Sequence, residues 1–120
     1  MYQLYGRKAW GSALAEAQLA AYGLGFEMIE LGDLFRSAEA RAAVVAHNPI
    51  TQVPTLLLPD GQVMTESAAI TLHLADVAGS TLFVPAVGDP TRPAFLRWLV
   101  FVVANIYPTF TYADDPARFV

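Results

Sequence analysis

The 120-residue chain contains no cysteine. This absence excludes a disulfide framework, a thiolate metal site, a Cys-x-x-Cys redox pair and a cysteine nucleophile supplied by the protein. The two histidines, His47 and His73, have no cluster of other metal-binding residues around them, so we expect no metal. His47 precedes an Asn-Pro helix stop and is expected to be solvated. Because the protein has no cysteine, any thiol chemistry must use sulfur that a ligand brings.

Basic residues are few: 7 Lys and Arg stand against 11 Asp and Glu, for a net charge of −4. They are also scattered along the chain, whereas a nucleic acid or an anionic membrane attracts clustered positive charge. We therefore expect neither of these partners. A small-molecule ligand fits the composition better.

The chain lacks the basic region followed by a sustained apolar stretch that a secretory signal needs, so we predict a cytoplasmic protein. Its longest apolar stretch, residues 95–110, is shorter than the roughly 20 residues of a membrane span. Arg97, Asn105 and Pro108 interrupt this stretch. We expect it to form a buried helix of a soluble protein.

The 55% hydrophobic residues are enough for one compact domain with an ordinary core. The hydrophobic pattern predicts strands at 2–5, 26–30, 55–58 and 62–64, and helices at 13–22, 37–46 and 66–77. The first two strands enclose a helix and should be parallel. The last two flank Asp60-Gly61, a hairpin signal, and should be antiparallel. The order β-α-β-α-β-β-α predicts an α/β fold with a mixed sheet.

Local signals refine two of these helices. Ser12 is a good N-cap for the helix at 13–22, and Gly23 is placed to end it in a left-handed conformation. In the helix at 66–77, the spacing of Ile70, Leu74 and Val77 puts these three side chains on one buried face.

From residue 79 the composition shifts to Gly, Pro, Ser and Thr, which predicts a linker over 79–92. A further helix is expected from Pro93 to about Tyr107. Residues 93–120 are too few to bury a core of their own. The chain is therefore either a fragment of a larger two-domain protein, or this helix packs on the first domain or on a partner subunit.

Pro54 stands at the mouth of an apolar strand, where it gives no N–H to the sheet. A cis Val53–Pro54 bond would turn the preceding peptide and free the N–H and C=O of Val53. These groups could pair with an extended peptide ligand, as in strand addition. The alternative is a trans proline that simply opens the strand.

Thr65-Glu66-Ser67 precedes the helix at 66–77. Free N–H groups and partial positive charge at a helix start can hold a carboxylate on Ser67, while Glu66 can take an ammonium group. Together with Val53, these groups describe a site for a small peptide. A plain helix start is the alternative.

These motifs resemble the N-terminal domain of a cytosolic glutathione transferase. The resemblance rests on Asn48-Pro-x-x-Gln-Val-Pro54, Asp60-Gly61 and Glu66-Ser67-Ala-Ala-Ile70, with Tyr5 and Gly23-Leu24 at matching distances. It implies a thioredoxin-like domain over 1–78 with a cis proline, and the start of an all-helical domain at 93–120.

The resemblance also implies a function. Glutathione would be held by Gln52, Val53, Pro54, Glu66 and Ser67, and its thiolate would attack a small electrophile. A homodimer is expected. Alternatives are a glutathione-dependent isomerase or dehalogenase, which would use the same site, and a non-catalytic module for protein assembly.

Two residues are candidates for stabilising the thiolate. Tyr5 matches the catalytic tyrosine of some classes in the family, and Ser12 lies near the serine or cysteine of others. We favour Ser12, because a hydroxyl and free N–H groups would meet at the helix start; the alternatives are an ordinary N-cap and a strand-end aromatic. Asn105 or Tyr107 would face the second substrate.

Overall fold

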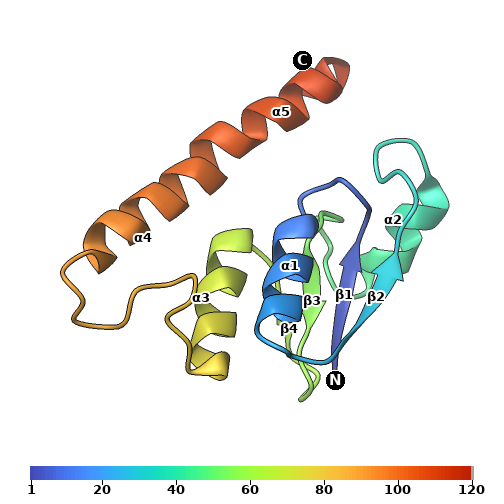
Figure 1. Cartoon of the computed structure of the whole chain (residues 1–120). Helices are drawn as coiled ribbons and strands as arrows, with labels where there is room; N and C mark the ends of the chain where they lie inside the picture. Colours follow the sequence, from blue (N-terminus) through green and yellow to red (C-terminus); the bar gives the residue numbers. More distant parts are fainter. Residues whose placement is uncertain (120) are drawn as a thin grey trace. The chain divides into compact units, whose positions relative to one another are not determined.

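The computed structural model describes residues 1–119 and divides the chain into two compact units, Met1–Ser80 and Thr81–Val120 (Figure 1). The first contains β1 (Tyr2–Gly6), α1 (Ala13–Ala21), β2 (Phe26–Glu30), α2 (Ala38–Val45), β3 (Thr55–Leu57), β4 (Val63–Met64) and α3 (Ser67–Ala78). This order confirms the predicted α/β, thioredoxin-like fold.

The four strands form one sheet in the order β2-β1-β3-β4. β1 is parallel to β2, with Tyr2 opposite Phe26, whereas β3 is antiparallel to both β1 and β4. Both predicted pairings are therefore present. They follow from the connections: a helical crossover joins the parallel pair, and the Asp60-Gly61 turn joins the antiparallel pair.

Side chains alternate across β1 and divide the core in two. Tyr2 and Leu4 are buried in the larger cluster, together with Ala15, Leu19, Leu56, Ile70 and Leu74 from α1, β3 and α3. The smaller cluster is built from Leu31, Leu34, Ala40 and Val44, and Tyr5 packs against it. The sheet therefore lies between α1 and α3 on one face and α2 on the other (Figure 1).

The helix ends agree with the sequence in part. Gly23 follows α1 with φ 67°, as predicted. Ser37 caps α2 by accepting a hydrogen bond from the Ala40 N–H at 3.1 Å. The prediction that Ser12 caps α1 with its side chain is wrong, because its hydroxyl bonds the Arg7 peptide instead.

Val77 also departs from its predicted place on the buried face of α3, since it is 50% exposed. The buried stripe of α3 consists of Ile70, Thr71, Leu74 and Ala75. Including Thr71 and Ala75 shifts the centre of that stripe around the helix, because each residue turns the helix by about 100°. Val77 therefore falls outside it.

The second unit contains one long helix. α4 (Arg92–Phe101) continues through a π-helical turn (Val102–Ile106) into α5 (Tyr107–Asp114), and a 3₁₀ segment, Pro116–Phe119, follows. The helix therefore extends beyond its predicted end near Tyr107. Pro108 lies in the first turn of α5, where a missing N–H is tolerated. The preceding π turn, closed by the Tyr107 N–H on the Val102 C=O, absorbs the change in register.

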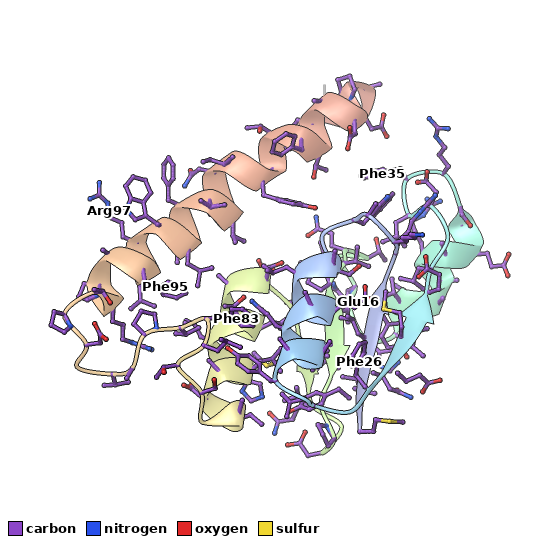
Figure 2. All side chains as sticks on the ribbon, in the orientation of Figure 1. Glu16, Phe26, Phe35, Phe83, Phe95 and Arg97 are labelled. Atoms are coloured by element: carbon purple, nitrogen blue, oxygen red, sulfur yellow. The ribbon has the colours of Figure 1, made fainter. Side chains whose placement is uncertain are left out.

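The prediction of a buried helix is not met in the described part of the chain, since no residue of α4, the π turn or α5 is buried. Figure 2 shows Phe95 and Arg97 on opposite sides of α4. Arg92–Asp114 is long and apolar enough to cross a membrane by length and composition alone, with a mean hydropathy of 1.3. A helix that packs into a larger soluble core meets the same two criteria.

Candidate peptide-binding site

Three strand ends meet at one end of the sheet. Tyr5 lies opposite Thr55, and Leu56 lies opposite Met64, so the end of β1, the start of β3 and the end of β4 are neighbours. α1 and α3 follow β1 and β4 and begin at this same end (Figure 1). The topology therefore brings the predicted peptide-binding residues, the loop before β3 and the start of α3, to one place.

The loop before β3 leaves both backbone polar groups of one residue, Val53, unpaired. The Val53–Pro54 bond is cis. The C=O of Gln52 accepts hydrogen bonds from Asn48 Nδ2 at 3.2 Å and from Thr55 Oγ1 at 2.8 Å. Within residues 1–119, neither the N–H nor the C=O of Val53 has a hydrogen-bond partner. Val53 therefore offers a donor and an acceptor at the head of β3.

Asn48 fixes the shape of this loop, a role that the sequence analysis missed. Its side chain is 4% exposed. Besides binding the Gln52 C=O, Nδ2 donates to Thr55 Oγ1 at 3.1 Å, and Oδ1 accepts from the Ile50 N–H at 3.1 Å. Thr51, which lies between Ile50 and Gln52 in the sequence, has a φ of 55°. Asparagine before proline indicated only the end of a helix, and no local signal revealed these contacts.

Glu66 and Ser67 begin α3 with free polar groups. Glu66 is the exposed N-cap residue, and its φ of 69° lies in the left-handed region that residues other than glycine seldom adopt. In the described part of the chain, neither the Glu66 carboxylate nor the Ser67 hydroxyl has a hydrogen-bond partner. Backbone outliers of this kind cost about 1–3 kcal/mol and concentrate at ligand clamps and active sites.

Ser12 is bonded within its own loop. Its side chain is fully buried, accepts from the Arg7 N–H at 3.0 Å and donates to the Arg7 C=O at 3.1 Å. A hydroxyl has one proton, and here that proton is already used. In this structure the Ser12 hydroxyl therefore has no second proton for a thiolate, and its catalytic role stays a prediction.

Residues distant in the sequence also hold the loop at residues 7–12 in place. The Lys8 N–H donates to Glu30 Oε1 at 3.1 Å, and Arg7 pairs with Asp33 at 3.6 Å. The Arg7 guanidinium also lies 5.0 Å from the centre of the Trp10 ring. Glu30 and Asp33 are more than 20 residues away along the chain, so no local pattern predicted these contacts.

Tyr5 lies on the α2 side of the sheet, where its side chain packs against the same cluster as Trp10 and Val53. Its ring centre is 5.1 Å from that of His47. His47 is therefore half-buried against an aromatic ring, and the prediction that it is solvated holds only in part. Residues 1–119 contain no group of three or more His, Asp or Glu that could hold a metal.

Asn105 and Tyr107, the predicted contacts of a second substrate, belong to the other unit. Asn105 lies in the π turn and Tyr107 begins α5, and both side chains are exposed. Partial burial raises the pKa of Tyr107 above its usual 10.0, and the negative charge of Asp114 raises it further. Their position beside a ligand stays a prediction.

Comparison with known proteins supports one family. The model of the glutathione S-transferase N-terminal domain matches residues 15–77, a little over half of the chain. The chain is 38% identical over 118 residues to the uncharacterized GST-like protein YncG of Escherichia coli (strain K12), covering 98% of this chain and 57% of that protein.

Solved structures agree. A glutathione transferase from Methylococcus capsulatus is 32% identical with a TM-score of 0.84, over 97% of this chain and 57% of that one. A sphingomonad glutathione S-transferase complexed with glutathione is 30% identical with a TM-score of 0.78, over 91% and 54%. The chain thus spans little more than half the length of these relatives. It belongs to the glutathione S-transferase family.

Proposed function

We propose that the first unit binds glutathione, and that the protein transfers the thiolate of the bound tripeptide to an electrophilic small molecule. The observation that carries this proposal is the unpaired N–H and C=O of Val53, which lie at the same end of the sheet as Glu66 and Ser67. The sphingomonad relative complexed with glutathione supports the choice of ligand.

Each group has a chemical role in holding the tripeptide. The N–H and C=O of Val53 pair with the cysteinyl residue, as an added strand would. Pro54 has no N–H for the sheet ladder, so the ladder does not extend back to Val53. The γ-glutamyl carboxylate sits on the Ser67 hydroxyl and the N–H groups that begin α3, while Glu66 takes the ammonium group. The exposed Gln52 side chain adds a hydrogen bond.

Activation of the sulfur needs more than one group. A free thiol has a pKa near 8.5, and lowering it by two units takes about 2.7 kcal/mol. A hydrogen bond to a charged group supplies about 1.5–3 kcal/mol, and a helix start about 0.3–1 kcal/mol. We assign the hydrogen bond to Tyr5, whose hydroxyl has no partner within residues 1–119. Ser12 instead shapes the loop that precedes α1.

The reaction forms a carbon–sulfur bond. The thiolate attacks an electrophilic carbon, and the leaving group departs with its electron pair; in an addition, the carbon skeleton instead takes up a proton. Asn105 and Tyr107 would contact the electrophile. We expect no metal in this step and a cytoplasmic homodimer as the working form.

A second candidate is a non-catalytic assembly module that keeps the fold. The observation that favours it is that the Ser12 hydroxyl donates its proton to the Arg7 C=O, so that one of the two predicted catalytic groups has no proton for a thiolate. The two candidates differ in whether glutathione ionises when it binds. Absorbance of the thiolate on titration with glutathione supports the enzyme, and binding without it supports the module. An isomerase or dehalogenase would form the same thiolate.

Calorimetric titration with glutathione tests binding. We expect the wild-type chain to bind, and Ser67→Ala and Glu66→Gln each to weaken binding about tenfold or more, since the first loses a hydrogen bond to the ligand carboxylate and the second loses the negative charge that pairs with the ammonium group. Gln62→Ala, at the far end of the β3–β4 hairpin, is the control and should bind as wild type. If neither this chain nor a longer form carrying further C-terminal residues binds glutathione, the proposal is wrong.

A further inference from the structure

α1 and α3 are joined by a buried polar contact that the proposed mechanism does not use. Gln18 Nε2 in α1 donates to Thr71 Oγ1 in α3 at 2.9 Å. The two residues are 6% and 3% exposed, and the other residues that α1 and α3 bury are apolar. Two well-packed apolar residues at these positions would hold the helices together without any risk of unpaired polar atoms.

The contact continues into the first turn of α3. The Thr71 hydroxyl donates its proton to the C=O of Ser67 at 2.8 Å, while Gln18 Oε1 lies farther from it, at 3.3 Å. A chain of hydrogen bonds therefore runs from Gln18 through Thr71 to the peptide of Ser67. That residue begins α3 at the candidate site.

Apolar packing alone would leave the first turn of α3 loosely defined. The residues that α1 buries beside Gln18 are Ala15 and Leu19, and burial of such side chains is not directional. A hydrogen bond fixes both a distance and an angle. The Gln18–Thr71 contact therefore sets how α3 is rotated and how far it slides against α1.

We propose that Gln18 and Thr71 are positioning residues for the γ-glutamyl end of glutathione. Through the Ser67 peptide they hold the start of α3 at the place where it meets a ligand bound to Val53. The inference rests on the proposed function, and neither side chain touches the ligand.

Two variants test the link. Gln18→Met removes the amide but leaves the Thr71–Ser67 hydrogen bond, and Thr71→Val removes both hydrogen bonds with little change in shape. We expect each to weaken glutathione binding about three- to tenfold, the equivalent of one ordinary hydrogen bond. Thr71→Ser keeps the hydroxyl and should restore binding. Circular dichroism checks that every variant folds.

Ile70→Val is the matched control, because it removes one methylene from a fully buried neighbour of Thr71 and costs stability without touching the polar contact. It should bind glutathione as the wild type does. A double variant distinguishes an effect of Thr71 on the position of Ser67 from a general loss of packing between the helices. In Ser67→Ala/Thr71→Val the loss should be smaller than the product of the two single losses, since both changes act on one group of contacts.

The inference is overturned if the Gln18→Met and Thr71→Val variants fold and bind as the wild type does. It is also overturned if Ile70→Val weakens binding as much as they do, or if the double variant shows the full product of the single losses. In these cases Ser67→Ala still weakens binding and the proposed function stands. If the wild-type chain and its longer form bind no glutathione, both fall.

Discussion

The Ser12 hydroxyl bonds both polar groups of the Arg7 residue, accepting from its N–H at 3.0 Å and donating to its C=O at 3.1 Å. The loop at residues 7–12 is thereby closed into a ring by one fully buried side chain. This relationship explains why a serine stands here without reaching the solvent. Ser12 and Ser67 both stand at helix starts, but only the Ser12 hydroxyl has hydrogen-bond partners in the described chain. Replacing each by alanine should therefore affect stability differently.

We expect Ser12→Ala to lower the free energy of unfolding by about 1–3 kcal/mol, because the N–H and C=O of Arg7, which are partly buried, lose a partner. Ser67→Ala should change it by no more than about 0.5 kcal/mol, since the Ser67 hydroxyl has no partner in the described chain. Urea unfolding of both variants measures this. Equal stabilities for the two variants would contradict the assigned role of Ser12.

Gly6 is predicted to tolerate no side chain. A Cβ at this position would lie 2.3 Å from Ser12 Oγ and 2.8 Å from Met28 Cε. Gly6→Ala should therefore destabilise the chain by about 1–3 kcal/mol or more, as overpacking does. The measurement is again urea unfolding.

Gly25→Ala is the control for Gly6→Ala, because the nearest atom to its added Cβ is Met1 Cγ at 4.0 Å. It should leave stability nearly unchanged. Replacing Ser12 by glycine in the Gly6→Ala background removes the clash with Ser12 and leaves only that with the flexible end of Met28, so the double variant should lose less than the sum of the two single losses. If the two losses of unfolding free energy simply add, the side chain that Gly6→Ala introduces does not clash with Ser12.

Tyr5→Phe separates binding from activation. We expect glutathione affinity to change little, and the pKa of the bound thiol to rise by about one to two units, because a hydrogen bond to the thiolate is lost. Thiolate absorbance of the bound tripeptide, followed against pH, measures this. An unchanged pKa in Tyr5→Phe would assign activation to other groups, such as the N–H groups at the start of α1.

Tyr107 should titrate above its usual pKa of 10.0, first because of partial burial and second because of Asp114. As the raised pKa favours the protonated phenol in the folded chain, its contribution to stability is complete below pH 10 and declines as pH rises through the folded pKa. Ultraviolet titration against a Tyr107→Phe reference measures the shift. Asp114→Asn should bring the pKa of Tyr107 only part of the way back to 10.0. A full return to 10.0 would mean that Asp114, and not burial, is the main cause of the shift.

Local patterns in the sequence were enough for most of the fold. The strand at 26–30, the parallel β1–β2 pair and the Asp60-Gly61 hairpin all come from short-range periodicity and turn chemistry. The length of the last helix was underestimated, because Pro108 signals a stop and only a π turn lets the helix continue through it. That accommodation depends on backbone geometry which composition does not encode.

The candidate site was predicted less completely. Val53, Glu66 and Ser67 were identified because they stand at element boundaries with recognisable residues. The contacts of Asn48 and the pairing of Gln18 with Thr71, 53 residues apart, depend on tertiary packing. Ser12 was misjudged for the same reason: serine before a helix predicts a cap, and only the path of the preceding loop turns its hydroxyl inward.

The most direct test of the central claim is the amide spectrum of the ¹⁵N-labelled chain during titration with glutathione. The Val53 N–H has no partner in the described chain, and the amides that begin α3 are free, so these signals should move most on binding. The amides of Leu58 and Gly61, bonded within the β3–β4 turn, should stay in place. Saturable shifts at Val53 and Ser67 are the predicted result, and shifts confined to other regions would contradict the account.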